Sequence, residues 1–427
     1  MHLLKGDSST VEKIKIDILD DVFERFLNNF QLFRDRDVLR HDYIPKRLPH
    51  RETQIRYLGM IVAPILKMAR CSNVFIYGKP GTGKTAAMKY VLYRLEQKAV
   101  ESATSVKTAY VNCRLAGTEY RVLTSLCEAV NVHVPFTGLA VGEIFDRLKQ
   151  GLEVRKVSFI AILDEIDELV KTRGDGLLYE LTRINETLTK GKVSIVGISN
   201  DLYFKELLEP RVLSSLSEEE IVFRPYDASE LRDILRERAK LAFYDNMLSD
   251  SAIGLCAALA AGEHGDARRA LDLLRVAGEV AERNNKNPIT EDHVREAARR
   301  IEHDRVFDAL TNLTTHSKLV LFSVYLLGKA DIHSAITGDI YEVYGELCKE
   351  VGTSTLTQRR VSGLINELDA MGLLNARVVS RGRYGRTKKI SLAIPRTSFR
   401  KIYANDEYLG LLTSFTPTCL KGKHIGN

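Results

Sequence analysis

The sequence predicts an α/β domain with a parallel sheet and flanking helices, then a small helical domain, then an α+β module of three helices and a hairpin. Three observations support this order. Short apolar runs alternate with amphipathic helical stretches over residues 42–225, and helical periodicity alone continues over 226–303. Residues 304–395 end in a segment rich in arginine and glycine. We assign residues 1–41 to an N-terminal arm and residues 396–427 to a C-terminal tail.

The composition is typical of a globular protein of a reducing compartment. A chain of 427 residues is longer than one ordinary domain, and its hydrophobic fraction of 44% is sufficient for sizeable cores. The N-terminus is charged, and no segment has the roughly 18 uninterrupted apolar residues of a membrane span. The six cysteines form neither CxxC pairs nor a cluster with metal-ligand spacing. We therefore expect a cytoplasmic protein without a membrane partner.

The positive charge is concentrated near the C-terminus. Residues 357–401 contain eleven Lys and Arg against two Asp and Glu, a net of +9, although the whole chain has a net charge of only +6. A charge excess confined to one segment indicates an acidic partner for that segment, most simply nucleic acid. A solvated basic face is the alternative interpretation of the charge alone.

The predicted sheet of the first domain consists of apolar runs that are buried on both faces. Strands of this kind, separated by helices, are typical of a parallel sheet. We predict strands at residues 73–77, 108–112, 158–164, 193–199 and 220–225.

The helical domain that follows is predicted from two amphipathic stretches. Each has an apolar stripe with the period of an α-helix. The two stripes consist of Leu231, Ile234, Leu235 and Ala239, and of Ala270, Leu271, Leu274 and Ala281.

The octapeptide GKPGTGKT fits the phosphate-binding pattern G-x-x-x-x-G-K-[ST] and stands between a predicted strand and a predicted helix. Gly81 and Gly83 can adopt positive φ and let backbone N–H groups approach phosphates. We expect Lys84 to reach the β- and γ-phosphates of a bound nucleotide and Thr85 to bind Mg²⁺. The predicted contacts to ATP or ADP are Gly78, Lys79, Pro80, Gly81, Thr82, Gly83, Lys84, Thr85 and Ala86.

Carboxylates follow a buried strand further along the chain. Asp164 ends the run FIAILD, and we expect it to hold Mg²⁺. Glu165 is next, where it could orient and deprotonate the attacking water. Asn200 ends the following strand and could position the same water, although an Asn at a strand end is also a common turn former.

The third module has the pattern of a helix-turn-helix. Apolar residues repeat with helical spacing in residues 317–328 and 338–352, and a short turn leads to a third helix. Thr357 is the expected N-cap of that helix, whose apolar face comprises Val361, Leu364, Ile365, Leu368 and Met371. Its first residues are the ones that enter the major groove in such folds, so the predicted DNA contacts here are Thr357, Gln358, Arg359 and Arg360.

A basic hairpin follows this third helix. Its tip, SRGRYGRT, contains three arginines and two glycines without an acidic partner. The hairpin is similar to the wing of a winged helix, whose tip contacts the DNA backbone or minor groove. The predicted wing contacts are Arg381, Gly382, Arg383, Tyr384, Arg386 and Lys388.

Five segments together resemble a known family: GKPGTGKT, ILDEID, VGISND, LEPRVLSSL and GDARRALDLLR. They are similar to the AAA+ ATPases of the archaeal replication-initiator family, the homologues of origin recognition complex subunit one and cell division control protein six. The resemblance runs over about residues 43–395. It implies an AAA+ module, a helical lid and a C-terminal winged-helix domain, in agreement with the pattern of the residues.

The resemblance also implies roles for individual residues. Arg268 aligns with the second-sensor arginine, which reaches the bound phosphates from the lid; a solvated helix face is the alternative. Arg211 aligns with the arginine finger, which would complete the nucleotide site of a neighbouring subunit, although Ser214 and Ser215 occupy a stretch where some relatives carry a second arginine. Tyr43, Ile44 and Pro45 align with the segment that lines the adenine, or they belong to the ordinary core.

The function that the resemblance implies is replication initiation. ATP would act with Mg²⁺ as a conformational switch with slow hydrolysis. The partners would be double-stranded origin DNA, the replicative helicase and paralogous initiators, so the protein would be associated with the nucleoid. An ATP-dependent transcription regulator and a clamp-loader-like or DNA-remodelling ATPase are the alternatives.

Overall fold

The computed structural model describes residues 19, 31–216, 218–332, 334–380, 386–403, 406, 409–412 and 415–418. Contacts divide the chain into two units, Met1–Ala297 and Ala298–Asn427. None of the helices in the described residues is long and apolar enough to cross a membrane.

The first unit is built on a parallel sheet of five strands. The strands are β1 (Val74–Tyr77), β2 (Val106–Asn112), β3 (Ser158–Asp164), β4 (Lys192–Ser199) and β5 (Glu219–Val222). Their order in the sheet is β2-β3-β4-β1-β5, and all neighbours are parallel. The predicted α/β fold class with flanking helices is therefore confirmed.

The largest difference from the predicted strand boundaries is at the end of the fifth strand, and the starts of β1, β2, β4 and β5 differ by one or two residues. The fifth strand was expected to reach residue 225, but β5 ends at Val222. Pro225 has no N–H to donate to a ladder, and the N–H of Tyr226 bonds the carbonyl of Gly265 in the helical domain. The chain leaves the sheet at this point to join the next domain.

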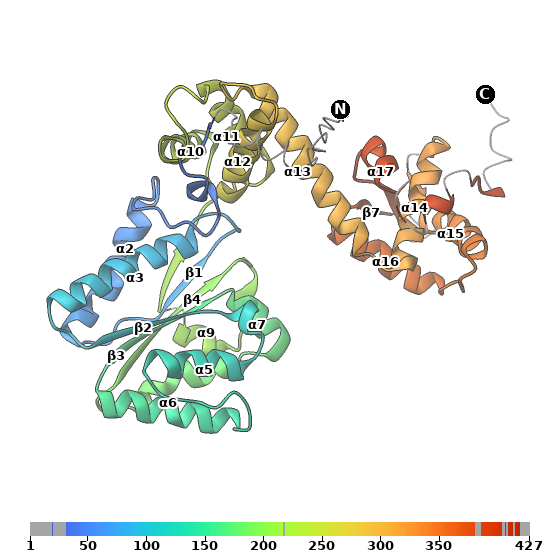
Figure 1. The fold of residues 1–427 in the computed structure, drawn as a ribbon. Coiled ribbons are helices and arrows are strands. Elements are labelled where there is room, and N and C mark those ends of the chain that lie inside the picture. Colours follow the sequence, from blue (N-terminus) through green and yellow to red (C-terminus); the bar gives the residue numbers. More distant parts are fainter. Residues whose placement is uncertain are drawn as a thin grey trace, which may run out of the picture. The chain divides into compact units, whose positions relative to one another are not determined.

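Helices cover both faces of the sheet, and Figure 1 shows α2 (Glu52–Val62) and α3 (Lys84–Glu101) on one side of it. Alternate side chains of β3 belong to separate cores, with Ile160 and Ile162 packed on the side of α2 and α3. The other core contains the remaining helices of the domain: α4 (Cys113–Ala116), α5 (Glu119–Ala129), α6 (Val141–Arg155), α7 (Ile166–Arg173), α8 (Gly176–Arg183) and α9 (Pro210–Leu216). The sheet is therefore buried on both faces.

The helical domain comprises α10 (Ala228–Ala242), α11 (Asp250–Glu263), α12 (Ala267–Arg283) and the beginning of α13 (Glu291–Thr311). Side-chain oxygens cap the first three of these helices: Asp227, Ser249 and Asp266 each accept backbone N–H groups of the first turn. Part of the arm packs here, because the Phe33 ring lies 4.7 Å from that of Phe243.

The second unit contains α14 (Thr315–Lys329), β6 (Ala335–Ile336), α15 (Thr337–Val351), α16 (Gln358–Ala370), β7 (Leu374–Ser380) and β8 (Arg386–Leu392). The strands form an antiparallel sheet in the order β6-β8-β7. The predicted winged-helix fold is confirmed. Strand β6 was not predicted, because two residues are too few to show a sequence pattern.

Two details of this unit differ from the sequence analysis. Met371 was expected on the buried face of α16, but the helix ends at Ala370 and Met371 is 52% exposed. The segment assigned to a tail contains α17 (Arg396–Tyr403), whose Phe399 and Tyr403 are buried. Their rings pack against those of Phe322 and Tyr325 of α14, so α17 belongs to the core of the module.

Candidate functional site

A cleft of about 680 Å³ lies at the carboxyl ends of the parallel strands, where ligands bind in open α/β sheets. The phosphate-binding loop, the strand ends, the segment of residues 40–49 and the helical domain all contribute to its lining. The predicted residues that the structure brings together here are Tyr43, Ile44, Pro45, Gly81, Thr82, Gly83, Lys84, Thr85, Ala86, Asp164, Glu165, Asn200 and Arg268. A cleft of this size is suitable for a nucleotide.

The phosphate-binding loop has the backbone conformation that its glycines predict. Gly81 and Gly83 have φ angles of 71° and 89°, and α3 begins directly after Gly83, at Lys84. Left-handed conformations of this kind allow loop N–H groups to approach an anion bound at the beginning of α3. Gly78, Lys79 and Pro80 were also predicted contacts, but they do not line the cleft.

The Lys84 ammonium is buried and held by the loop itself. Its Nζ donates to the carbonyl oxygens of Gly78 at 2.7 Å and Lys79 at 2.8 Å. Burial lowers the pKa of Lys84 to about 8, the Asp164 carboxylate opposes that shift, and the positive charge of Arg268 adds to it. Because water screens a buried charge only weakly, the protonated ammonium would attract an anionic phosphate in the cleft strongly, and the phosphate would in turn favour the protonated form.

Asp164 is the centre of the predicted metal site. Its Oδ2 accepts hydrogen bonds from the Thr85 hydroxyl at 2.8 Å and from the Tyr110 hydroxyl at 2.6 Å, and its Oδ1 accepts the Glu165 N–H at 2.9 Å. A carboxylate and a hydroxyl in contact beside a phosphate loop are the oxygen ligands that suit Mg²⁺, which takes its other ligands from phosphates and water. The residues present therefore fit a magnesium ion.

Tyr110 was not identified from the sequence. It lies on β2, next to β3 in the sheet, and its register brings its hydroxyl to Asp164. Burial and the bond to Asp164 raise the pKa of Tyr110, so the hydroxyl remains a hydrogen-bond donor. An isolated tyrosine in a strand has no sequence signal that separates it from a core residue.

We expect Tyr110→Phe to raise the Mg²⁺ concentration needed for tight nucleotide binding about tenfold, because groups that orient metal ligands contribute on this scale. The measurement is a Mg²⁺ titration of the binding of a fluorescent ATP analogue. Binding in EDTA should be unchanged. Tyr93→Phe, on the exposed side of α3, is the matched control. An unchanged Mg²⁺ dependence would exclude this role for Tyr110.

Glu165 and Asn200 both line the cleft, each directly after the end of a strand, β3 and β4 respectively. Glu165 has a left-handed backbone with φ of 52°, and its Oε2 is 4.0 Å from an Arg114 guanidinium nitrogen. The N–H of Asn200 donates to Asp167 at 3.3 Å, which fixes the end of β4 against α7. Strand β4 lies between β3 and β1, so Asn200 emerges between the metal site and the phosphate loop.

The helical domain touches the phosphate loop directly. The N–H of Ala267 donates to the Gly81 carbonyl at 3.2 Å, and a Cβ placed on Gly81 would lie 1.6 Å from Oδ1 of Asp266. Arg268 lines the cleft one residue further along. Only a glycine at position 81 permits this approach of the lid to the loop.

Apolar side chains also line the cleft. Ile234 of α10 and Leu271 of α12 line it together with Ile44. The Tyr43 ring is covered by the Arg238 guanidinium at 4.5 Å, and the same guanidinium donates to the carbonyl of Val38 at 2.9 Å. The structure therefore brings the predicted adenine-lining segment onto the lid.

Arg51 is a second residue that sequence reasoning missed. It is 3% exposed, and its Nε donates to the Thr82 carbonyl of the phosphate loop at 2.9 Å. Its Nη2 donates to the carbonyl of Arg224 at 2.6 Å, and its guanidinium stacks 3.7 Å from the centre of the Tyr226 ring. The side chain thus joins the loop to the connection between sheet and lid.

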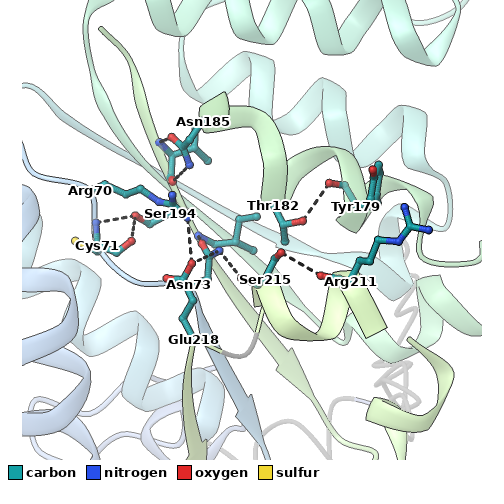
Figure 2. Close-up of polar contacts among 12 residues, drawn as sticks. Arg70, Cys71, Asn73, Tyr179, Thr182, Asn185, Ser194, Arg211, Ser215 and Glu218 are labelled. Carbon is teal, nitrogen blue, oxygen red and sulfur yellow. Dashed lines mark hydrogen bonds and ion pairs between the residues drawn. The ribbon is translucent and has the colours of Figure 1, made fainter. Parts of the chain in front are cut away.

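Arg211 lies on α9, outside the cleft. Figure 2 shows its guanidinium pointing away from the hydrogen bonds that anchor the end of this helix. There Asn73 donates from Nδ2 to the Ser215 carbonyl at 2.7 Å and from its backbone N–H to Glu218 at 2.8 Å, while the Ser215 hydroxyl donates to the Arg211 carbonyl at 3.0 Å. The helix is fixed to the sheet, and the Arg211 side chain is exposed.

In the second unit, α16 begins as predicted, with Thr357 accepting the Arg360 N–H at 3.4 Å. Gln358, Arg359 and Arg360 are exposed in the first turn. Lys388 of β8 donates to Asn366 of the same helix. The predicted wing contacts Arg381, Gly382, Arg383 and Tyr384 lie outside the described residues, as does the side chain of Arg386.

Family models match three stretches of the chain. The AAA domain matches residues 68–203, the Cdc6 AAA+ ATPase-type lid domain matches residues 232–299, and the CDC6 C-terminal winged helix domain matches residues 308–401. The third match extends into α17.

Individual proteins match over nearly the whole chain. An ORC1-type DNA replication protein of Thermococcus onnurineus is 50% identical over 395 residues, which are 92% of this chain and 95% of that protein. Its counterpart in Pyrococcus furiosus is 50% identical over 392 residues, 91% of this chain and 93% of that protein. The structure of the Aeropyrum pernix ORC1 protein in complex with DNA is similar with a TM-score of 0.79 at 50% identity, covering 89% of this chain and 99% of that one.

Proposed function

Because the chain belongs to the family of ORC1-type DNA replication proteins, we propose that it is an ATP-dependent replication initiator. It binds origin DNA through its winged helix and AAA+ domain and recruits the replicative helicase. The observation that carries this proposal is the 50% identity to replication proteins over 92% of the chain, which includes all three modules. This similarity favours a replication initiator over a transcription regulator or a clamp loader, because the relatives matched over more than nine-tenths of the chain are replication proteins.

ATP binds in the cleft with its phosphates on the loop after β1. Loop N–H groups and the beginning of α3 hold the phosphates, and Lys84 supplies a buried positive charge. Thr85 and Asp164 hold Mg²⁺, which when bound neutralises phosphate charge during hydrolysis. Ile44, Ile234 and Leu271 supply the apolar wall for the base.

Hydrolysis depends on groups at the ends of the neighbouring strands. Glu165 orients the attacking water and accepts its proton, and Asn200 holds the same water from β4. Arg268 approaches the phosphates from the lid and stabilises the charge that develops on them. The proposed turnover is slow, because each hydrolysis event serves only to return the conformational switch to its initial state.

The switch operates through the contact between lid and loop. Asp266 and Ala267 lie against Gly81, so any change in the phosphates bound by the loop alters the position of α12. A nucleotide can shift this equilibrium only by its different affinity for the two lid positions. Arg51, which bonds both the loop and the start of the lid connection, transmits the change.

Arg211 acts on a neighbouring subunit. It is exposed on a helix that Asn73 and Glu218 fix to the sheet, which is the combination of rigidity and access that an arginine finger needs. The neighbour would be a second copy or a paralogous initiator whose nucleotide lies at the shared interface.

The DNA contacts of the winged helix come from the second unit. The first turn of α16, with Thr357, Gln358, Arg359 and Arg360, enters the major groove. Lys388 and the wing contact the DNA backbone or minor groove. The structure of the related Aeropyrum pernix ORC1 protein in complex with DNA supports DNA binding by this chain.

The proposal is tested by mapping where the protein binds on its own chromosome and comparing that map with the positions where replication starts. Occupancy at the starts is expected, and depletion of the protein should abolish initiation there. Occupancy spread over promoters, with replication starting elsewhere, would identify a transcription regulator. The Arg359→Ala, Arg360→Ala variant, which loses two positive charges of the first turn, should lose the occupancy.

A further inference from the structure

The residue directly before the N-cap of α16 is held by two tyrosines of α15. The N–H of Leu356 donates to the Tyr344 hydroxyl at 3.1 Å, and the Tyr341 hydroxyl donates to the Leu356 carbonyl at 3.0 Å. Thr357, the N-cap, follows immediately. Both backbone polar groups of Leu356 are thus paired with side chains of the preceding helix.

Tyr344 is itself fixed by a third helix. It is fully buried, and its hydroxyl lies 2.8 Å from Nδ1 of His316 in the first turn of α14. Burial raises the pKa of Tyr344 to about 12, so its hydroxyl stays neutral. A hydroxyl that accepts the Leu356 N–H still has its own hydrogen for the imidazole nitrogen. The Tyr344 hydroxyl therefore ties α14, α15 and the turn before α16 together.

These hydrogen bonds restrict the position and rotation of α16 more closely than its apolar contacts do. Val361, Leu364, Ile365 and Leu368 bury one face of the helix. Hydrophobic burial is non-directional, so it keeps this face inward but opposes small sliding or rotation of the helix only weakly. Hydrogen bonds depend on distance and angle. Two of them at Leu356 fix the height and rotation at which α16 begins.

The placement of the exposed first turn of α16 depends on the position of Leu356. Gln358, Arg359 and Arg360 are the side chains proposed to reach base edges, and they stand two to four residues after Leu356. Base-edge contacts require correct side-chain placement, whereas attraction to phosphates tolerates displacement. An error in the position of Leu356 would therefore affect sequence reading more than general DNA affinity.

We propose that Tyr341 and Tyr344 are positioning residues for base recognition, which hold the turn before α16 so that its first turn meets DNA in one orientation. This inference rests on the proposed function of α16 as the DNA-reading helix. Neither tyrosine touches the DNA. Their effect is on discrimination between sequences.

The test uses the full-length variants Tyr341→Phe, Tyr344→Phe and the double variant. The probes are a duplex that the wild-type protein enriches from a randomised library and a scrambled duplex of equal length. Tyr403→Phe is the matched control, because its hydroxyl is also buried in this module but lies 3.5 Å from that of Tyr325, in the contact between α17 and α14. Hydrogen exchange of residues 353–360 is measured in parallel.

We expect the double variant to lose about tenfold in affinity for the enriched duplex, as two hydrogen bonds of modest net energy imply. Affinity for the scrambled duplex and the salt dependence should be unchanged, and exchange over residues 353–360 should be faster. Tyr341 is only partly buried, so Tyr341→Phe should fold and show part of this loss.

Equal loss on both duplexes, no loss on either, or an equal loss of discrimination in Tyr403→Phe would overturn the inference. A wild-type protein that binds duplexes without enriching any sequence would also overturn it. A wild-type protein that binds no duplex at all would contradict the proposed function itself. The two failures are thereby distinguished.

Discussion

Replacement of Glu165 by Gln is expected to lower the rate of ATP hydrolysis at least about 100-fold, as removal of a general base does. ATP binding should be retained, because the amide has the same shape as the carboxylate and the proposed phosphate contacts are those of the loop and Lys84, not of Glu165. The measurement pairs phosphate release under saturating ATP with titration of a fluorescent ATP analogue.

The matched control for this prediction is Glu168→Gln. Glu168 lies three residues further along, on α7 and outside the cleft, and its carboxylate is 46% exposed. Hydrolysis by that variant should equal that of the wild type. Glu165→Gln protein that hydrolyses ATP at the wild-type rate would remove Glu165 from the catalytic role.

The second large effect is expected for Gly81→Ala, which should weaken ATP binding by about tenfold or more. An L-residue in the left-handed conformation of Gly81 costs about 1–2 kcal/mol, and 1.4 kcal/mol is a factor of ten. In addition, the new Cβ would lie 1.6 Å from Oδ1 of Asp266, so the lid could not rest on the loop. Nucleotide titration measures the first effect, and protease sensitivity of the lid measures the second.

Two further variants separate these causes. Gly254→Ala, in α11, places the same methyl group in open space and should leave binding unchanged. Asp266→Ser keeps an N-cap oxygen on a shorter side chain, so combining it with Gly81→Ala should restore part of the lid contact. If Gly81→Ala alone binds ATP as the wild type does, the loop does not hold the phosphates in the conformation described.

Much of the fold follows from patterns that are local in the sequence. The helix after the phosphate loop, the N-cap Thr357 and the apolar faces of the lid helices are set by neighbouring residues, and the structure confirms them. The predictions failed where the local signal was short or misleading. Met371 continues a helical stripe but follows the end of its helix, and the aromatic pair of α17 stands in a charged segment.

Some residues of the candidate site are likewise predicted by local motifs, and others are not. The motifs place Lys84, Thr85, Asp164 and Glu165 at strand ends that a parallel sheet must bring together, and they meet in the cleft. Tyr110 and Arg51 carry no motif, because their roles depend on the register of β2 beside β3 and on the approach of residue 51 to the loop. The roles assigned to these side chains in catalysis and binding remain predictions.

By itself, the sequence determined the five strands of the parallel sheet, the place of the phosphate loop and of the helix-turn-helix, and a resemblance to one family, but not β6 or α17. These properties depend on residue spacing within a few turns of chain. The tertiary structure alone decided that Asp266 rests on Gly81, that Tyr110 bonds Asp164, and that Tyr344 holds Leu356. Asp266 and Gly81, like Tyr110 and Asp164, are separated by long stretches of chain. Such pairs meet only through the packing of whole elements, which no local pattern encodes.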